Sequence, residues 1–519
     1  MKKFLKKLIL FSVAVSLVAS MCSCRSKKNA VTEDNPDKEV TLKMIVGGTG
    51  MQADTPLVVE EVNKLLVDRL PNTKLELEVI PTSDYAQKWQ LIAGANETVD
   101  VAWHGWMIDY VSEVKKGAYM AIDELVDLYG ANIKADIPGW MLDNLKVDGK
   151  LYAIPCNQLS VTKPISFRTY THLSDEYLDE AALVKALEEN TQAPGGSTPL
   201  SDAAFTVIDE YFANLKNAGK FQKGLDPTSM DWFAEINNYS SVELETTYVT
   251  FDENGKPTVN DSYALDAPDN FYRWAQDFYK KGYIRNDVLT AQNLSASIGP
   301  DGYAAWITSY DDMCEEIESK RYNIGIKAIP FSKEYIQPIS ASATNITIPR
   351  TSANPVRAMK FIDIINDSKD PAVLNTLTYG IEGKHYEKTG ENTIKTLAYE
   401  STPQLDSAYG NYAWIFGNVF NVYYTQNDNP AYNEYSVTLN NNAVAHKLAG
   451  FRINTAPIKT ELAQITSVKA EYKGLRYGAY PDYKTALKEY REKIQACGQQ
   501  KIVAELQKQL DEWYENKNK

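Results

Sequence analysis

Residues 40–50 read VTLKMIVGGTG, an alternating apolar stretch that ends in a glycine-rich turn. From Val40 onward apolar side chains recur at every second position, which predicts a β-strand. Pro56 then begins a helical pattern, in which apolar residues recur every three to four positions up to Leu70. Residues 75–79 read LELEV and alternate again. Strand, helix and strand at this spacing predict a βαβ unit and therefore a parallel sheet.

A predicted helix over 85–95 and a buried strand over 99–102 continue this pattern, and the strand runs into WHGW at 103–106. Ligand sites in open α/β sheets lie beyond the carboxyl ends of strands, so 47–50 and 103–106 are the first candidate binding segments. The turn at 47–50 lacks the GxGxxG spacing and the GK[ST] ending of phosphate-binding loops. We interpret it as a tight turn whose backbone approaches ligand, not as a nucleotide site.

The rest of the chain predicts a second α/β region followed by helices. A hairpin is expected to turn at Asn254-Gly255, a strand to cover 324–330 and a helix to cover 355–365. The last hundred residues are mostly helical in pattern, and there is no internal repeat. A chain of 519 residues is too long for one hydrophobic core and is typical of two or three domains.

The first 24 residues have the layout of a secretory signal. Lysines precede an apolar run from Leu8 to Val18, which is too short for a spanning helix. Small residues and cysteines follow, which is similar to bacterial lipoprotein signals, where the cysteine at the cleavage site receives a diacylglyceryl group. Cys24, preceded by a serine, is the predicted lipidation site, and Cys22 is the alternative. Two acyl chains would hold the protein at the extracytoplasmic face of the cell membrane. A plain cleaved signal is the other interpretation.

Composition narrows the remaining possibilities. We expect residues 1–23 to be a signal peptide and 24–39 to form a flexible tether, because this stretch is charged and has no hydrophobic pattern. The net charge of −14 argues against binding to nucleic acid. Four scattered histidines argue against a metal enzyme. The later cysteines form no disulfide framework, although one bridge is left open among Cys156, Cys314 and Cys497.

Several stretches, in order along the chain, carry a family resemblance: VTLKMIV, VDVAWHGW, KGAYMAIDELVDLYG, DGKLYAIP, YGIEGKHYE and EKIQACGQQKIVAELQKQLDEW. Through them the chain resembles the extracellular solute-binding protein family 1, and specifically its LipO-like lipoproteins. DGKLYAIP marks the wider superfamily. YGIEGKHYE together with the ELQKQLDEW tail is more specific to the LipO-like branch.

The resemblance implies an α/β, two-lobe periplasmic-binding-protein-like fold with a ligand cleft between the lobes and a helical C-terminal region. Lobe 1 would comprise 40–156 with 338–383, and lobe 2 would comprise 157–337 with 384–519. It further implies a monomeric binding protein without catalytic residues or a cofactor. Such a protein would carry an oligosaccharide or glycoside to the permease subunits of an ABC importer.

Sugars present apolar C–H faces ringed by hydroxyls, so their sites combine flat aromatic surfaces with a few polar groups. The aromatic candidates are Trp103 and Trp106 at a strand end, and Trp232, Trp306 and Trp414, which resemble cleft aromatics of the superfamily. The polar candidates are His104, Asn157, Gln158, Asp231, Tyr310 and Asn345. For each, an ordinary core aromatic or a solvated loop residue is the alternative.

Two other functions stay open at this point. A secreted glycoside hydrolase would need two carboxylates about 5–10 Å apart across a cleft. The 68 acidic residues leave room for such a pair, but no hydrolase motif marks one. A receptor that presents ligand to a sensor kinase would have a sequence of the same kind.

Overall fold

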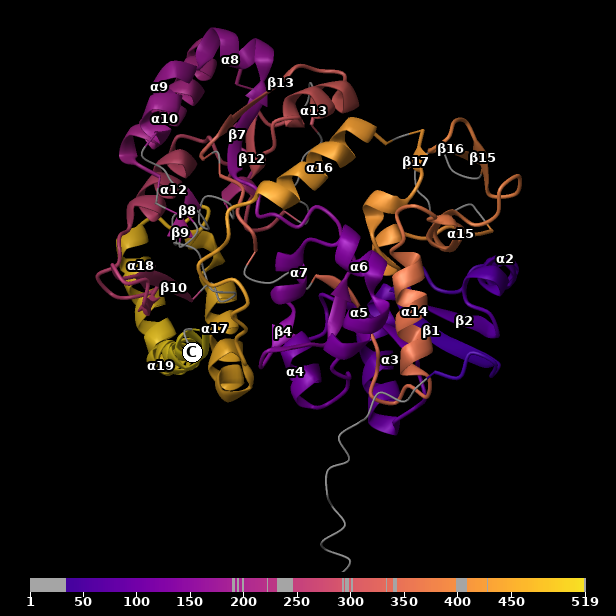
Figure 1. Ribbon diagram of the computed structural model, residues 1–519. Coiled ribbons are helices and arrows are strands. Elements are labelled where there is room, and N and C mark those ends of the chain that lie inside the picture. The colour runs from indigo at the N-terminus through magenta and orange to yellow at the C-terminus, as the bar shows by residue number, and fades with distance from the viewer. Residues whose placement is uncertain are drawn as a thin grey trace, which may run out of the picture.

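The computed structural model has the predicted two-lobe α/β fold, with the lobes side by side and a separate hydrophobic core in each (Figure 1). No helix within the described ranges is long and apolar enough to cross a membrane. The predicted signal peptide, with Cys22 and Cys24, lies outside the described residues. The structure describes residues 34–188, 192–193, 196–197, 200–221, 223–230, 246–291, 294, 298–299, 302–332, 334–338, 343–397, 408–426 and 428–517.

Lobe 1 is built on a five-stranded sheet in the order β2-β1-β3-β14-β6. Its strands are β1 (Val40–Gly48), β2 (Thr73–Pro81), β3 (Val101–Gly105), β6 (Ala153–Pro155) and β14 (Thr344–Thr347). β1 pairs in parallel with both β2 and β3, which confirms the predicted βαβ unit. β14 runs antiparallel to β3 and β6, so it begins at the edge of the sheet where β3 and β6 end.

Helices cover both faces of this sheet. Pro56 lies in the first turn of α2 (Thr55–Arg69), and the helix buries Val58, Val62 and Leu66 on one face. The predicted helix over 355–365 forms as α14 (Pro355–Ile365) over those same residues. The other elements of lobe 1 are α3 (Thr82–Ala95), α4 (Tyr110–Lys115), α5 (Asp123–Tyr129), α6 (Ala131–Asp136), α7 (Gly139–Asp143), β4 (Lys146–Val147), β5 (Lys150–Leu151) and α15 (Ala372–Tyr379).

The predicted boundary after residue 383 is wrong, because described residues that follow it still pack in lobe 1. Ile415 and Phe416 are fully buried in the lobe 1 core, and the Tyr409 hydroxyl donates to the Leu377 carbonyl at 2.6 Å. Apolar side chains of this segment therefore complete the core over α15 and the end of β1. The segment contains β15 (Tyr386–Lys388), β16 (Thr393–Thr396), η1 (Ala413–Ile415), η2 (Val419–Asn421) and β17 (Tyr424–Thr425).

Lobe 2 has a smaller sheet than lobe 1. It is three-stranded and antiparallel, with β7 (Ile165–Tyr170) between β12 (Ala305–Ser309) and β13 (Ile326–Pro330). Phenylalanines such as Phe167, Phe205 and Phe278 fill its core. Its other elements are α8 (Thr171–Tyr177), α9 (Glu180–Leu187), β8 (Gln192–Ala193), β9 (Gly196–Ser197), α10 (Asp202–Asn217), α12 (Asn270–Lys280) and α13 (Cys314–Tyr322).

The predicted helical C-terminal region is a distinct part of lobe 2 with its own core. It consists of the antiparallel hairpin β10 (Thr247–Phe251) and β11 (Pro257–Asp261), η3 (Ala456–Ile458), α17 (Lys459–Glu471), η4 (Lys473–Leu475), α18 (Tyr483–Ala496) and α19 (Gln499–Lys517). The hairpin turns at Asn254-Gly255, as predicted, and Gly255 supplies the positive φ of 78° that the turn requires. α19 packs on β11.

The three cysteines of the described chain are free thiols. Cys156 and Cys314 are buried, and Cys497 is half-buried. The bridge that the sequence left open therefore does not form among them. Burial raises the pKa of the Cys156 thiol, which keeps it protonated and unreactive.

Candidate functional site

Three of the predicted aromatic residues lie together at the carboxyl edge of β3. Trp106, one residue beyond the strand, is 59% exposed. Its ring centroid lies 5.8 Å from that of buried Trp103 and 5.7 Å from that of Trp414. Tyr412 stacks on Trp414 at 5.0 Å, with the ring planes 18° apart. We call Trp103, Trp106, Tyr412 and Trp414 the aromatic platform.

Buried neighbours hold the aromatic platform in place. The Trp103 ring is fully buried and meets Tyr85 edge-on at 5.0 Å. The Tyr85 hydroxyl donates to the Trp103 carbonyl. A methyl group at Gly47 or Gly105 would overlap the Trp103 ring, so both glycines are required by close approach. Gly47 near the end of β1 and Gly105 at the end of β3 thus make room for a tryptophan.

Tyr412 and Asn411 were not among the predicted site residues. Asn411 is 6% exposed, and neither side-chain atom of its amide has a hydrogen-bond partner among the described residues. It lies beside Gly48, at the carboxyl end of β1. Buried amides are normally paired, so an unpaired one next to Tyr412 of the platform marks a place where ligand or water supplies the partner. The sequence signal was the spacing of Asn411, Tyr412 and Trp414 within one short segment.

The platform shares its sheet edge with the connections to lobe 2. Thr344 pairs with Gly105, and Asn345 pairs with Pro155. The chain therefore leaves lobe 1 after β6, and re-enters it at β14, at the edge that carries Trp106. Trp106 consequently lies on the side of lobe 1 from which the connections to lobe 2 leave.

The structure does not support direct ligand contact by His104 or Asn345. His104 alternates with Trp103 along β3 and therefore points to the other face of the sheet, where it is 1% exposed. Its Nδ1 lies 3.0 Å from the Tyr119 hydroxyl, and burial lowers its pKa to about 4. Asn345, opposite His104 on β14, is fully buried as well. Both central strands are covered on two faces, which the sequence pattern alone does not reveal.

Asn157 and Gln158 follow β6, where the chain leaves lobe 1 for lobe 2. The Asn157 amide donates to the Asp136 carbonyl at 3.2 Å, and the Gln158 amide donates to the Thr344 hydroxyl at 3.0 Å. The Gln158 carbonyl accepts from Asn440 at 2.7 Å. These contacts use one side-chain amide nitrogen of each residue, whereas the Asn157 side-chain oxygen is buried without a hydrogen-bond partner among the described residues. Ligand contact by Asn157 and Gln158 stays a prediction.

Two of the predicted lobe 2 residues are carried by β12, with Trp306 near the start of the strand and Tyr310 just beyond its end. Trp306 in β12 is 7% exposed and packs against Tyr170 at 5.4 Å, so its ring is mainly a core aromatic. Tyr310 follows β12 and is half-buried. Its hydroxyl donates to the Asp312 carboxylate at 3.1 Å. The remaining two, Asp231 and Trp232, lie outside the described residues.

The helix α16 (Pro430–Asn442) crosses between the lobes (Figure 1). On the lobe 1 side, the Trp140 indole donates to the Asn440 carbonyl at 3.1 Å. On the lobe 2 side, the Lys163 ammonium bonds Asp311 at 2.9 Å and Tyr432 at 2.8 Å. This helix is therefore the third connection between the lobes and the one that contacts the other two.

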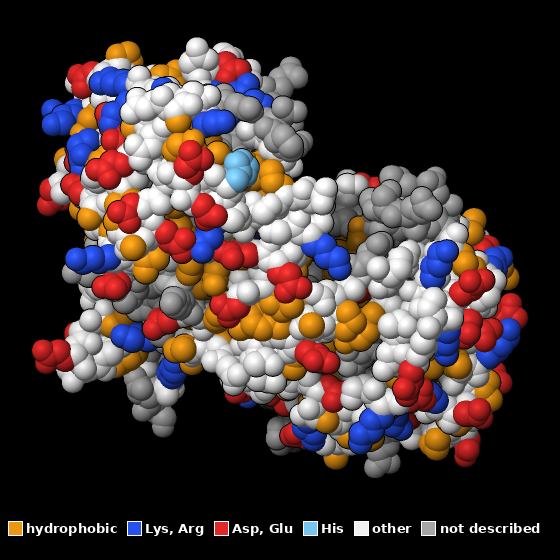
Figure 2. Space-filling view, turned by 90° about the horizontal axis from the view of Figure 1, so that it is seen from above, with side chains coloured by type: hydrophobic (Ala, Val, Ile, Leu, Met, Phe, Trp, Pro, Cys, Tyr) orange, Lys and Arg blue, Asp and Glu red, His pale blue; other side chains and the backbone are white. Residues whose placement is uncertain are grey.

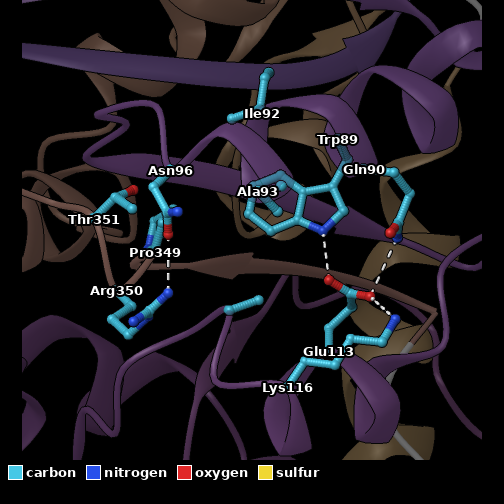
Figure 3. A pocket seen from close by; sticks show the side chains of 12 residues that line it. Trp89, Gln90, Ile92, Ala93, Asn96, Glu113, Lys116, Pro349, Arg350 and Thr351 are labelled. Atoms are coloured by element: carbon cyan, nitrogen blue, oxygen red, sulfur yellow. Dashed lines mark hydrogen bonds and ion pairs between the residues drawn. The ribbon is translucent and has the colours of Figure 1, made fainter.

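The surface seen from above is recessed between the two masses of the molecule (Figure 2). A separate cavity of about 180 Å³ lies in lobe 1 at the opposite sheet edge, beyond the end of β14 (Figure 3). There the Glu113 carboxylate accepts from Trp89 at 2.9 Å and from Lys116 at 2.8 Å. Arg350 donates to the Asn96 side chain at 3.0 Å. These polar groups satisfy one another, so this cavity shows no need for a ligand.

Comparison with known proteins gives two matches along the sequence. Residues 55–369 match the model of the bacterial extracellular solute-binding proteins, and residues 447–515 match a domain of unknown function, DUF3502. A curated protein of Streptococcus pneumoniae serotype 4, a carbohydrate ABC transporter substrate-binding protein, is 25% identical over 533 residues, which cover 100% of both chains.

Solved structures share the fold. The N-glycan transport solute binding protein NgtS from Streptococcus pneumoniae is 21% identical, covers 92% of this chain and 100% of its own, and gives a TM-score of 0.68. The TM-score is 0.57 for NgtS in complex with Man1GlcNAc, where the identity is 21% and 91% of this chain and 99% of that one are covered. An extracellular solute-binding protein from Bifidobacterium longum subsp. infantis is 13% identical, covers 91% of this chain and 98% of its own, and gives 0.59.

Proposed function

The chain belongs to the bacterial extracellular solute-binding protein family, and from this premise we propose that it binds an oligosaccharide or glycoside between its lobes and delivers it to an ABC permease. Members of this family act outside the cytoplasm and bind solute without transforming it, which sets the glycoside hydrolase alternative aside. The observation that carries the carbohydrate assignment is Trp106, 59% exposed on a backing of buried Trp103 and neighbouring Trp414. The name of the pneumococcal relative agrees with it.

The chemistry of the platform suits a sugar ring. An exposed indole offers a flat apolar face for pyranose C–H groups, while Tyr412 and Asn411 supply hydrogen-bonding atoms beside it. Aromatic contacts contribute about 0.5–1.5 kcal/mol each beyond burial. Micromolar affinity needs about 8 kcal/mol before the cost of ordering the partners. Stacking is therefore insufficient, and desolvated hydrogen bonds and contacts from lobe 2 must add the rest.

Lobe closure would provide those added contacts. A ligand that touches both lobes stabilises the arrangement in which both sets of contacts form. In support, NgtS resembles this structure less in its complexes with Man1GlcNAc and Man5GlcNAc, at TM-scores of 0.57 and 0.55, than in a further solved form, at 0.68. Tyr310 and the edge of Trp306 are the lobe 2 groups that we propose would meet the ligand on closure.

We further propose that Cys24, with Cys22 as the alternative, carries a lipid anchor at the extracytoplasmic face. The described chain begins at Asp34, which bonds Arg357 at 2.9 Å near the start of β2. The tether would thus leave lobe 1 at the amino edge of its sheet, away from Trp106. Detergent phase partitioning of Cys24→Ser and Cys22→Ser variants should show which substitution releases the protein from membranes.

Calorimetry with an oligosaccharide panel tests the binding proposal. At least one sugar should bind and be recovered chemically intact, and Trp106→Ala should weaken its binding at least tenfold. Leu128→Ala is the matched control, because Leu128 is 61% exposed on α5, away from the platform. Binding confined to peptides or amino acids would overturn the carbohydrate assignment. A pull-down from membranes, with this protein as the bait, distinguishes a permease partner from a sensor kinase.

A further inference from the structure

A larger cavity, of about 270 Å³, lies within the C-terminal helical region of lobe 2. Residues of α12, α17, η4 and α18 line it, on the left side of Figure 1. Its lining lies largely within the segment that matches the domain of unknown function. It is unconnected with the aromatic platform, because none of the platform residues lines it.

The charge of the lining is the opposite of that of the chain. Five tyrosines and the three cations Lys469, Lys473 and Arg476 line the cavity, and no acidic residue does. The chain as a whole has 68 acidic and 54 basic residues. The nearby Glu471 carboxylate is bonded to Lys493, outside the lining, at 2.5 Å. A basic, half-buried recess in an acidic protein is an electrostatic attractor for a small anion.

A further cation, Arg491, directly follows Tyr490 of the cavity lining. Arg491 is 6% exposed and donates to the carbonyls of Leu265 at 3.3 Å and Pro268 at 3.0 Å. Its Nε has no hydrogen-bond partner among the described residues, and no carboxylate of those residues forms an ion pair with it. Buried cations are normally paired, so positive charge here is in excess. Consistent with this, burial and the neighbouring Arg476 lower the pKa of Lys469 to about 8.

The rest of the lining offers ring faces and hydroxyl groups. Tyr472 and Tyr490 have ring centroids 5.4 Å apart, and Tyr263 meets Tyr490 edge-on at 5.4 Å. Aromatic faces and phenolic hydroxyls together suit a hydroxylated ring more than a bare inorganic ion. The volume lies just below the roughly 300–1,000 Å³ of sites for drug-sized ligands, so it fits one ring and not a sugar chain.

We propose that this cavity binds an acidic monosaccharide, with the carboxylate between Lys469 and Arg476 and the ring against the tyrosines. The site is independent of the oligosaccharide site between the lobes. A single uronic acid unit has the required size, charge and hydroxyl groups. This would make the C-terminal region a second ligand-binding part of the protein.

Calorimetry of the full chain with D-glucuronate, D-glucose and acetate tests the proposal. Glucuronate should bind, and glucose and acetate should each bind at least tenfold more weakly. Lys469→Gln and Arg476→Gln should each weaken glucuronate binding at least tenfold. Arg476→Lys, which keeps the charge, should bind glucuronate more tightly than Arg476→Gln does. Trp106→Ala should leave it unchanged, which separates this site from the one proposed between the lobes.

Lys488→Gln is the matched control, because Lys488 is on α18, carries the same charge, and its side chain is 75% exposed. If Arg476→Gln does not fold, as judged by its melting curve, Lys469→Gln decides the matter. Absence of glucuronate binding, equal binding of acetate, or binding that Lys469→Gln leaves intact would each overturn the proposal.

Discussion

Trp103 supports Trp106 edge-on, with the two ring centroids 5.8 Å apart and the ring planes at 88°. One ring is fully buried and the other is 59% exposed. The orientation of the exposed ring is thus set by a neighbour that packing holds in place. Changes that displace Trp103 should therefore affect ligand binding without touching any ligand atom.

Gly105→Ala should displace Trp103 in this way. The added methyl group would overlap the indole, and overpacking of a core typically costs about 1–3 kcal/mol. We expect a loss of that size in the free energy of unfolding, measured by urea titration, and weaker oligosaccharide binding by calorimetry. Gly94→Ala is the control, because a methyl group there meets nothing within 4 Å and should stabilise α3 by up to about 1 kcal/mol. Wild-type stability and binding in Gly105→Ala would contradict the packing argument.

Asn411→Leu should separate ligand binding from stability. Leucine has nearly the shape of asparagine, and removal of an unpaired buried amide should leave the free energy of unfolding unchanged or raise it by about 1 kcal/mol. Affinity for the oligosaccharide should fall about tenfold because the ligand loses a partner. Urea titration and calorimetry on the same preparation measure both. A stability loss above about 2 kcal/mol would mean that the amide is paired within the protein.

His104 should make stability depend on pH. Its folded-state pKa of about 4 lies below the 6.5 of the unfolded chain, so between these values only the unfolded chain binds the proton. Stability should therefore fall as the pH decreases from about 6.5 towards 4, by about 2 kcal/mol between pH 7 and pH 5 from this residue.

Urea titration of the wild type and of His104→Gln at both pH values isolates that contribution. Half-buried His446, whose pKa is also lowered to about 4 by desolvation, contributes equally to the pH dependence of both proteins and cancels in the comparison. His172→Gln is the control, because His172 is exposed on α8. The same slope in the wild type and in His104→Gln would rule out a titrating His104.

Asp311→Asn should weaken the hinge. Lys163 lies between Asp311 and Tyr432, and loss of one partner of a largely buried ion pair costs about 3–5 kcal/mol. We expect a lower melting temperature and faster amide hydrogen exchange in α16. Glu434→Gln, an exposed change on the same helix, should alter neither. Unchanged exchange in α16 would show that this helix is held by other contacts.

Asp34→Asn should destabilise lobe 1 although it lies outside the sheet. Arg357 is 2% exposed, and Asp34 accepts hydrogen bonds from both its Nε and Nη2. Burial alone would raise the pKa of Asp34, but the hydrogen bonds from Arg357 and Lys360 outweigh it and lower the pKa. We expect a loss of about 3 kcal/mol by urea titration at pH 7. Exposed Asp37→Asn is the control, and equal stability of the two variants would contradict the prediction.

Local patterns predicted the elements whose periodicity is strong. The βαβ unit from Val40, the helix that begins at Pro355 and the turn at Asn254-Gly255 all form as expected, because each rests on neighbouring residues. The pairing of Trp106 with Trp414 depends on contacts more than 300 positions apart, and only the strand-end rule and the family resemblance pointed to it.

The misassigned segment and the buried polar residues show what local patterns omit. Ile415 and Phe416 look like any apolar pair in a loop, and only the folded sheet shows that they close the lobe 1 core. His104 follows Trp103 on a strand covered on both faces, so alternation could not tell which face meets solvent. Burial on two sides removes the amphipathic signal.

The bond between Asp34 and Arg357 has a mechanical consequence. It fixes the start of the described chain to lobe 1 alone, at one edge of its sheet. A pulling force applied through the N-terminus therefore acts on lobe 1 and is not transmitted across the three connections between the lobes. With the proposed lipid anchor on the chain before Asp34, a rotation of lobe 2 would leave the point of attachment to the membrane stationary.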